Sequence, residues 1–314
     1  MKRSLALIAA ALLAVSAAAH AAYPDRPIKL IVPWGAGGDT DNIYRAFQPM
    51  FQKHLGGTIV IANVGGASGT RGAKEAKDSP PDGYTIFAVH DSIHSTYYTG
   101  VADVNYWDFE PICLVSATPS ILTAAPDTPW KNIKDLIADA KAHPGTITVG
   151  ATLGSTSHFF PALVEKAAGL KFKYVAYEGT AKRMNALLGS HIQLAESNLT
   201  QKGKVDAGQM KFLAIATAKR MPQMPELPTL KENGIDVEYA VHRGLVAPKG
   251  TNRTALRKLR AACGAAAREP AFAKAMDLQG TLVDYKNAKD YEAFLKKNDA
   301  LNKELAKELG LLKR

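Results

Sequence analysis

The sequence predicts an α/β fold in two lobes with a central cleft, and two observations lead to this prediction. Short apolar runs alternate with segments that repeat apolar residues at helical spacing along almost the whole chain. Extended segments near residues 118–125 and 236–243 separate two such series, and we expect the chain to cross between the lobes there. The first lobe would then comprise residues 23–120 and 241–314, and the second residues 121–240. A single large sheet is the alternative.

The first residues have the features of an export signal. Lys2 and Arg3 precede an apolar run at 5–15, and Ala19 and Ala21 stand at the positions that a signal peptidase reads. This run is shorter than the roughly 20 apolar residues that a membrane anchor needs. We therefore expect residues 1–22 to be a cleaved signal peptide and the mature protein to be periplasmic.

Composition and charge limit the classes of function. The 314 residues suffice for two domains, and 46% hydrophobic and 22% charged residues are ordinary for a globular protein. The formal net charge of +10 falls to +8 without Lys2 and Arg3, and no block of five or six like charges occurs. Because the chain is expected to be exported, we expect no nucleic-acid partner. The basic excess is interpreted as a solvated surface that steers anions.

The first series of elements follows the signal directly. Strands are predicted at 28–33, 58–62 and 84–89, and apolar residues at helical spacing predict a helix at 41–55. Apolar strands separated by helices are typical of a parallel sheet with both faces covered. Residues 112–125 are expected to be extended.

The second series begins with a helix that Thr128 would cap and Pro129 would open, and that ends near Gly145. Later strands are predicted at 147–150, 172–176, 192–195, 212–217 and 241–247, and later helices at 159–168, 180–188, 251–268, 271–279 and 290–309. Glycine directly follows several of these helices or lies one residue beyond, as expected for C-terminal caps.

A glycine-rich segment, residues 33–41 (PWGAGGDTD), lies between the first strand and the first helix. Its glycines let backbone N–H groups point at an anion, and the helix N-terminus adds a positive partial charge. Ligands of open α/β sheets bind beyond the carboxyl ends of strands, where this segment is expected. A dinucleotide fingerprint would need glycine at Thr40. Asp41 is either a ligand or a helix cap. The candidate ligand-binding residues here are Trp34, Ala36, Gly37, Gly38 and Asp39.

A second polar turn, residues 154–158 (GSTSH), also lies between a strand and a helix. Gly154, Ser155 and Thr156 offer hydroxyl and N–H groups to a second carboxylate. A nucleophile elbow would need a closing glycine, which this turn lacks. A capping serine with a packing histidine is the structural alternative, and an exported hydrolase using Ser155 with His158 or His242 is the enzymatic one.

Polar residues at other predicted strand ends complete the candidate binding set. They are His90, Asp91, Ser92, Tyr177, Glu196, Asn198 and Arg243. Arg243 could form a bidentate pair with a carboxylate or a hinge salt bridge with a neighbour such as Glu178. His90, Asp91 and His94 lack a visible fourth partner, so we expect no metal.

The two cysteines leave two possibilities open. An oxidising compartment permits a disulfide between Cys113 and Cys263. Cys263 also lies on the apolar face of a predicted helix, where a buried thiol would fit. Sequence alone does not show whether the two Cα atoms approach closely enough.

Several motifs resemble one family over essentially the whole mature chain. They are residues 23–28 (YPDRPI), 33–41, 79–85 (SPPDGYT), 149–158 (VGATLGSTSH), 177–180 (YEGT) with 186–189 (ALLG), and 243–251 (RGLVAPKGT). The chain resembles the periplasmic substrate-binding proteins of tripartite tricarboxylate transporters, also called Bug receptors.

The resemblance implies a type II periplasmic-binding-protein fold whose two lobes close like a Venus flytrap. It implies that the loops around Trp34–Asp39 and Gly154–Thr156 hold carboxylates, partly through ordered water. It also implies two integral membrane subunits as partners and no cofactor. Ala36 stands where proline is common in the family. Asp39 and Glu196 are acids that either accept hydrogen bonds from an amino or hydroxyl group of the ligand or point away.

The resulting functional prediction is capture of a di- or tricarboxylate or an aromatic acid without chemical conversion, by a monomer that is not an enzyme. A ligand shifts the closure equilibrium by its differential affinity for the two states. A sensory binding protein that presents the same ligand to a membrane receptor kinase is a further alternative.

Overall fold

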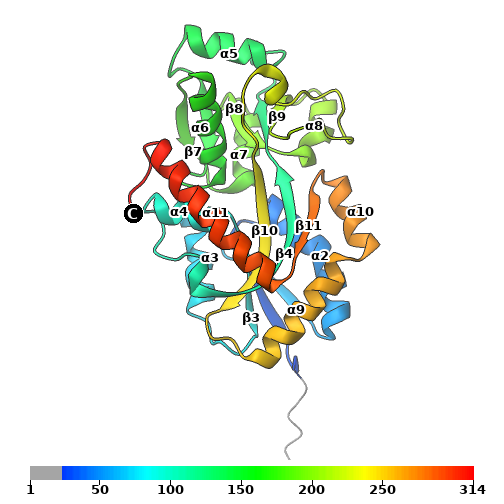
Figure 1. Ribbon diagram of the computed structural model, residues 1–314. Coiled ribbons are helices and arrows are strands. Elements are labelled where there is room, and N and C mark those ends of the chain that lie inside the picture. Colours follow the sequence, from blue (N-terminus) through cyan, green and yellow to red (C-terminus); the bar gives the residue numbers. More distant parts are fainter. Residues whose placement is uncertain (1–22) are drawn as a thin grey trace, which may run out of the picture.

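Two separate β-sheets organise the chain (Figure 1). The computed structural model describes residues 23–314, so the expected signal peptide at 1–22 lies outside the described residues. The larger sheet has six strands in the order β11-β4-β10-β3-β1-β2, and the smaller has five in the order β7-β6-β8-β5-β9. Helices pack on both sheets, which confirms the predicted two-lobed α/β fold.

The larger sheet, that of the first lobe, is mixed. Its strands are β1 (Ile28–Val32), β2 (Ile59–Asn63), β3 (Thr85–His90), β4 (Phe109–Pro119), β10 (Ala240–Pro248) and β11 (Leu282–Lys286). β1 is parallel to β2 and β3, whereas β10 is antiparallel to β3 and β4. The expectation of a parallel sheet is therefore correct only for the N-terminal strands, because β10 enters the sheet centre in the opposite direction.

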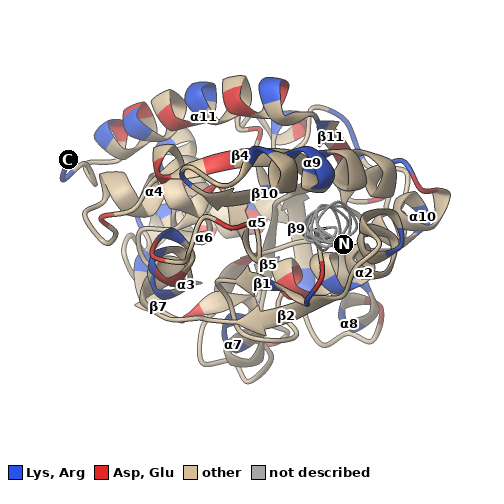
Figure 2. Ribbon diagram, turned by 90° about the horizontal axis from the view of Figure 1, so that it is seen from below, with Lys and Arg blue, Asp and Glu red and all other residues tan. Residues whose placement is uncertain are grey.

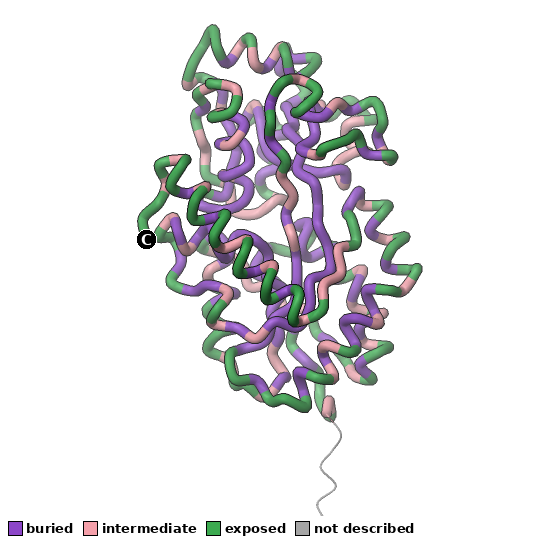
Figure 3. Tube along the Cα trace, in the orientation of Figure 1, coloured by how far each residue is buried: buried purple, intermediate pink, exposed green. Residues whose placement is uncertain are grey.

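Both faces of this sheet are buried, as the continuous apolar strands predict. Successive residues of β1 point to opposite faces, so Leu30 packs in one core cluster and Ile31 in another. The first cluster also contains Phe47 and Phe272, whose rings meet edge to face at 4.9 Å. Figure 3 shows the central strands β4 and β10 largely buried and the outer faces of the covering helices exposed.

The helices of the first lobe come from both ends of the chain. They are α2 (Asp39–Leu55), α3 (Thr70–Lys77), α4 (Ser92–Tyr98), α9 (Arg253–Ala267), α10 (Pro270–Leu278) and α11 (Ala288–Glu308), with short 3-10 helices η1 (Ala67–Gly69) and η2 (Tyr106–Asp108). The C-terminal end of α11 reaches the second lobe, where Glu308 pairs with Lys166 at 2.9 Å. The sequence analysis did not predict α3, α4 or β11.

The smaller sheet and its neighbouring helices come from one continuous stretch of sequence. Its strands are β5 (Ile121–Ala124), β6 (Thr148–Ala151), β7 (Lys173–Ala176), β8 (Leu194–Ser197) and β9 (Lys211–Ile215), and its helices are α5 (Ile133–Ala142), α6 (Thr156–Ala168), α7 (Gly179–Leu188) and α8 (Lys202–Asp206), with the 3-10 helices η3 (Leu199–Gln201) and η4 (Lys231–Asn233). Its core packs Leu122, Trp130, Val149 and Phe160 together.

The start of α5 differs from the prediction. The helix begins at Ile133 and not at Pro129, because the side chain of Asn132 accepts hydrogen bonds from the N–H groups of Lys134 and Asp135. An asparagine oxygen satisfies the free N–H groups of a first turn well. Thr128 instead donates its hydroxyl to the carbonyl oxygen of Ala125.

Two adjacent segments connect the lobes. Only Ser120 separates β4 from β5, and β10 begins at Ala240 opposite Pro119. The N–H of Ser120 donates to the carbonyl oxygen of Tyr239, so the two crossing segments are hydrogen-bonded to each other. Figure 1 shows β4 and β10 running side by side through the middle of the molecule.

Cys113 and Cys263 form a disulfide that ties β4 to α9. Their Cα atoms lie 6.5 Å apart, and both residues are fully buried in the core of the first lobe. This resolves the alternatives that the sequence left open. The half-cystine of α9 lies on the apolar helix face, as predicted, but its sulfur is bonded and not a free thiol.

Charged residues are dispersed over the surface. Figure 2 shows Lys and Arg interspersed with Asp and Glu along α11. This arrangement agrees with the absence of long like-charge runs in the sequence. Within residues 23–314 no helix combines the length and apolar character that crossing a membrane requires.

Candidate functional site

A cavity of about 450 Å³ lies between the two lobes. The first lobe contributes the loop after β1, the start of α2, His90 at the end of β3, and Arg243 of β10. The second lobe contributes the turns before α6 and α7 and the end of β8. The volume falls within the range typical of small-molecule sites.

The side chain of Asp41 stabilises the loop after β1. Asp41 accepts hydrogen bonds from the N–H of Gly37 at 2.9 Å, from Arg45 at 2.8 Å and from Asn63 at 2.9 Å. Burial would raise the pKa of Asp41, but these donors outweigh burial and lower it. Gly37 has φ +74°, a left-handed conformation that glycine adopts without strain. Of the two possibilities for Asp41, the structural role is therefore the one observed.

The turn before α6 presents hydroxyl and N–H groups. The hydroxyl of Ser155 donates to the carbonyl oxygen of Thr152 at 2.7 Å, and the N–H of Thr152 donates to the Ser157 hydroxyl at 3.0 Å. Thr156 and Ser157 begin the helix and line the cavity. First-turn N–H groups have no intrahelical acceptor, which suits them to an anion.

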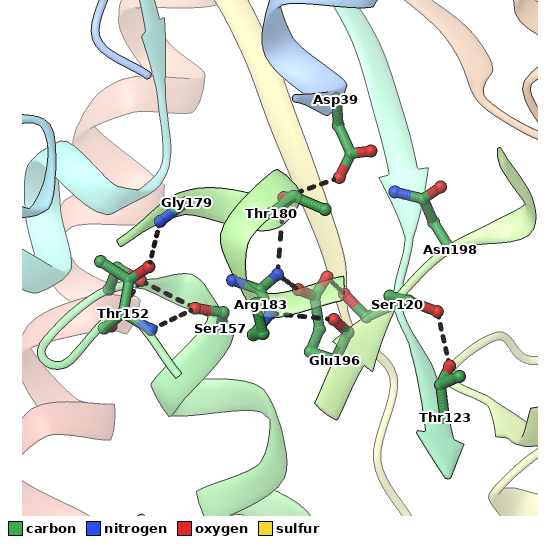
Figure 4. A network of polar contacts seen from close by, with 12 residues as sticks. Asp39, Ser120, Thr123, Thr152, Ser157, Gly179, Thr180, Arg183, Glu196 and Asn198 are labelled. Atoms are coloured by element: carbon green, nitrogen blue, oxygen red, sulfur yellow. Dashed lines mark hydrogen bonds and ion pairs between the residues drawn. The ribbon is translucent and has the colours of Figure 1, made fainter. Parts of the chain in front are cut away.

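A polar chain crosses the cavity between the lobes (Figure 4). The Thr180 hydroxyl at the start of α7 donates to Asp39 at 3.1 Å, and Arg183 reaches the same hydroxyl oxygen at 3.5 Å. Arg183 also pairs with Glu196 at 2.6 Å, and the Ser120 hydroxyl donates to Glu196 at 3.1 Å. Arg183 and Glu196 are both buried, so each neutralises the other away from water.

Arg243 is a buried cation without an ionic partner. Its side chain donates to the hydroxyls of Thr40 at 3.0 Å and Thr118 at 2.7 Å and to the carbonyl oxygen of Val241 at 3.3 Å. All three acceptors are neutral, and no carboxylate of residues 23–314 lies within ion-pair distance. The alternative of a salt bridge with Glu178 is wrong, because Glu178 instead accepts the N–H of Ser68. A buried, uncompensated guanidinium favours an anion beside it.

Two aromatic rings form part of the cavity wall. Trp34 and His90 stack with their ring centres 5.0 Å apart and an interplanar angle of 17°. Burial, together with the positive charge of Arg243, lowers the pKa of His90 to about 3. The His90 ring is therefore neutral at physiological pH and leaves Arg243 as the unpaired positive charge on this wall.

The cavity brings together nine of the predicted binding residues and omits six. Those that line it are Trp34, Ala36, Gly38, Asp39, His90, Ser155, Thr156, Glu196 and Arg243. Those that do not are Gly37, Asp91, Ser92, Gly154, Tyr177 and Asn198.

Three of the omitted residues have structural roles in the segments around the cavity. The Asn198 side chain accepts the N–H of Thr200 and so caps η3, and the N–H of Ser92 donates to the His90 ring. Gly154, at φ +77°, faces Thr99 of the first lobe, where a β-carbon would lie 2.6 Å from the threonine hydroxyl. These residues were predicted as ligands because each follows a predicted strand. The sequence position does not show that neighbouring residues occupy their polar groups, or the space beside them, instead.

Asp91 does not line the cavity and belongs to a separate buried cluster with His242 and Asn298. It accepts hydrogen bonds from the backbone N–H of His242 at 2.8 Å, from the His242 ring at 2.9 Å and from Asn298 at 2.6 Å. This carboxylate holds the start of β10 against α11. His94, which the sequence places beside it, pairs with Asp299. Within the described chain no group of three or more His, Cys, Asp or Glu could hold a metal ion.

The His242–Asp91 pair predicts a pH dependence of stability. Burial would lower the pKa of His242, but Asp91 outweighs burial and raises it, with Asp284 adding to the increase and Lys286 opposing it. The unfolded value is about 6.5. The pair therefore stabilises the fold fully below this pH, and the contribution is lost as the pH rises through the raised pKa. Thermal unfolding from pH 6 to 9 should show His242→Gln with a weaker pH dependence than the wild type. An equal dependence in both would contradict the assignment, and His191→Gln, at an exposed histidine, is the matched control.

Comparison with known proteins decides the family. The chain matches the tripartite tricarboxylate transporter family receptor, TctC, over residues 43–311. This chain belongs to that receptor family. The match confirms the resemblance that the sequence motifs carried and covers elements of both lobes.

Members of the TctC family and related binding proteins share the fold over most of the chain. The periplasmic binding protein BugD is 33% identical, with a TM-score of 0.88 over 93% of this chain and 100% of BugD. A Rhodopseudomonas palustris protein solved with adipate is 28% identical, with a TM-score of 0.87 over 92% of this chain and 98% of its own. A UPF0065 protein of Cupriavidus necator is 31% identical over 93% of this chain and 90% of its own length. The type II periplasmic-binding-protein fold is thereby confirmed.

The TctC-family chain is a solute-binding receptor and not an enzyme. The residues that a hydrolase would use, Ser155 with His158 or His242, have other hydrogen-bond partners. The Ser155 hydroxyl bonds to Thr152 and Ser157, whereas His158 accepts the N–H of Gly154 at 3.2 Å. The ring of His242 is bound to Asp91 in the first lobe. Neither candidate base is hydrogen-bonded to the candidate nucleophile within residues 23–314.

The cavity is also lined by residues that were not among the predicted binding residues. They are Gly35, Thr40, Gly65, Gly66, Arg71, Thr152, Ser157, Glu178, Gly179, Thr180, Ala181, Lys182, Arg183 and Val241. The motif at 177–180 was noted for its resemblance and could have directed attention to Thr180. Arg71 lies in α3, which was not predicted, and nothing in the helical pattern of 180–188 distinguishes buried Arg183 from exposed Lys182.

Proposed function

We propose that this receptor captures a small carboxylate in the periplasm, after cleavage of the signal peptide at residues 1–22, and delivers it to the integral membrane subunits of a tripartite transporter. The observation that carries the ligand assignment is Arg243, a buried guanidinium in the cavity that has only neutral acceptors. An arriving carboxylate would supply the missing counter-charge and a geometry that matches the guanidinium.

The second lobe supplies complementary dipoles. The helices α6 and α7 both begin at the cavity, and their first-turn N–H groups favour negative charge. A dicarboxylate could therefore contact the first lobe through one end and a helix start of the second lobe through the other. The adipate-bound relative supports a carboxylate ligand in this fold.

We propose residues 23–120 with 241–314, and residues 121–240, as the two bodies that close on the ligand. Several hydrogen bonds cross between them beside the cavity, among them that of the Ser120 hydroxyl to Glu196 at 3.1 Å. Thr180 donates to Asp39 at 3.1 Å, and Ser68 donates through its hydroxyl to the carbonyl oxygen of Leu153 at 3.0 Å and through its N–H to Glu178 at 3.3 Å. A ligand that binds between the two bodies shifts the balance between open and closed states by its differential affinity for them.

The proposed ligand contacts are the nine candidate residues that line the cavity. The segments after β1 and β6 carry six of them and start at strand ends, which suits them to rearrangement around a ligand without disturbing the sheets. Gly37, Asp91, Ser92, Gly154, Tyr177 and Asn198 are not included, because they do not line the cavity.

Titration calorimetry of the mature chain tests the proposal. We expect at least one acid from a panel of mono-, di- and tricarboxylates and aromatic acids to bind saturably at one site per chain and to raise the unfolding temperature. The matched uncharged amides should not bind, because they cannot neutralise Arg243. Saturable binding of the amides, or no saturable binding of any acid, would refute the proposal.

A further inference from the structure

Five buried ionisable side chains line the cavity: neutral His90, and four charged groups of which only two neutralise each other. Arg183 and Glu196 form an ion pair at 2.6 Å. Asp39 and Arg243, which are 7% and 4% exposed, form no ion pair with any residue of the described chain. Among the buried charged groups of the cavity, one anion and one cation are therefore unpaired. Partly buried Glu178 and exposed Arg71 and Lys182 also line it without an ion pair to any residue of 23–314.

The two unpaired groups are neighbours. Arg243 donates to the hydroxyl of Thr40, the residue that directly follows Asp39 at the start of α2. They nevertheless do not pair with each other within 4.0 Å, the limit for an ion pair. The first lobe thus offers a guanidinium and a carboxylate that both line the cavity, and Thr40 links the guanidinium to the residue next to Asp39.

Helix capping does not account for the charge of Asp39. Asp41, one half-turn further along α2, shows what a structural acid looks like here, with a backbone, an amide and a guanidinium donor. Asp39 receives one hydroxyl, from Thr180 in the opposite lobe, and makes no capping hydrogen bond. Arg183 reaches it only through that hydroxyl.

A second carboxylate increases the demand for a cation near Asp39. Burial raises the pKa of Glu196, Arg183 lowers it, and the negative charge of Asp39 raises it again. The two acids, both buried, therefore influence each other. A positive group from outside the protein would relieve this repulsion.

From these contacts we infer that the ligand carries an ammonium group next to its carboxylate, so that the receptor takes a small amino acid in its charged form. The carboxylate binds Arg243, and the ammonium group donates to Asp39. A hydroxyl in the same place would donate a hydrogen bond but leave the charge of Asp39 uncompensated. This inference rests on the proposed carboxylate-binding function and narrows its ligand class.

Matched sets of acids test the inference by calorimetry at neutral pH. Succinate, malate and aspartate differ only in a hydrogen, hydroxyl or ammonium at one carbon, and propionate, lactate and alanine form the equivalent monocarboxylate set. In whichever set binds, we expect the amine to bind at least about tenfold tighter than the other two members. This comparison needs no variant, so it does not depend on the folding of a mutant.

The variant Asp39→Asn adds a second test. We expect it to lose about tenfold or more in affinity for the amine and to stay within about twofold for the unsubstituted acid. Asp127→Asn, at an exposed aspartate that does not line the cavity, should leave every affinity unchanged. Thermal unfolding without ligand shows that both variants are folded.

Two results would overturn the inference while leaving carboxylate capture intact. One is an unsubstituted or hydroxy acid that binds the wild type as tightly as its amine counterpart. The other is unchanged amine affinity in Asp39→Asn. If no acid of either set or of the wider panel binds saturably, the proposed function itself fails, and the inference fails with it.

Discussion

Replacing Arg243 with glutamine is expected to weaken carboxylate binding by about a hundredfold or more. The guanidinium is the one buried cation of the cavity that no described carboxylate neutralises, so its charge is available to the ligand. Removing one member of a buried charge pair costs roughly 2–5 kcal/mol of binding free energy. Calorimetry with the best acid of the panel measures the loss directly.

The same variant should not destabilise the empty protein. Without ligand, burial of an unpaired charge is unfavourable, and a glutamine amide can still donate to Thr40 or Thr118. We therefore expect an unfolding temperature equal to or above that of the wild type, combined with a lost ligand-induced increase. Arg257→Gln, at an exposed arginine, is the matched control and should bind normally. Wild-type affinity in Arg243→Gln would remove the observation on which carboxylate capture depends.

Removing the disulfide is expected to cost about 2–5 kcal/mol of folding free energy. Cys113 and Cys263 are 150 residues apart in sequence, so the bond closes a long loop and restricts the unfolded chain. Both half-cystines are also fully buried, and alanine in their places would leave space in the core. The double variant Cys113→Ala, Cys263→Ala should unfold on the order of 5–15 °C below the oxidised wild type.

A reductant separates the contribution of the bond from that of the side chains. Reduction should lower the unfolding temperature of the wild type and leave that of the double variant unchanged. Ligand affinity should be nearly the same in all forms, because neither cysteine lines the cavity. If reduction leaves the wild-type transition where it was, the bond does not stabilise the fold.

Much of the fold could be predicted because its local signals agree with its long-range packing. The strands β1 and β3 are apolar runs bounded by turns, and the glycine-rich loop at 33–41 marks where a strand gives way to a helix. Both signals arise within a few residues of chain. The elements that were missed have weak local signals: α4 reads SIHSTYY, and the edge strand β11 leaves Leu282 and Val283 exposed.

The sequence predicted the cavity residues that lie in turns with a local sequence signal. It missed the cavity residues whose position depends on tertiary packing. Glycines and hydroxyl residues mark the turns before α2 and α6 in the sequence, so the cavity residues of these two turns could be predicted. The burial of Arg183 depends on Glu196 and Ser120, which belong to other elements, and no spacing along α7 reveals them. Asn198 was expected at the cavity because it follows a strand, but its side-chain oxygen accepts a hydrogen bond from the N–H of Thr200.

Because β10 lies at the centre of the larger sheet, this sheet cannot finish folding until β10 has been synthesised. β10 is paired on one side with β3 and on the other with β4, yet it is made only after the whole second lobe. Until residues 240–248 arrive, β3 and β4 have unpaired edges of the kind that promote aggregation. A chain that stops before this point would keep a contiguous second lobe but could not finish the first. Truncation from the C-terminus is therefore far more damaging than the modest length of the missing piece suggests.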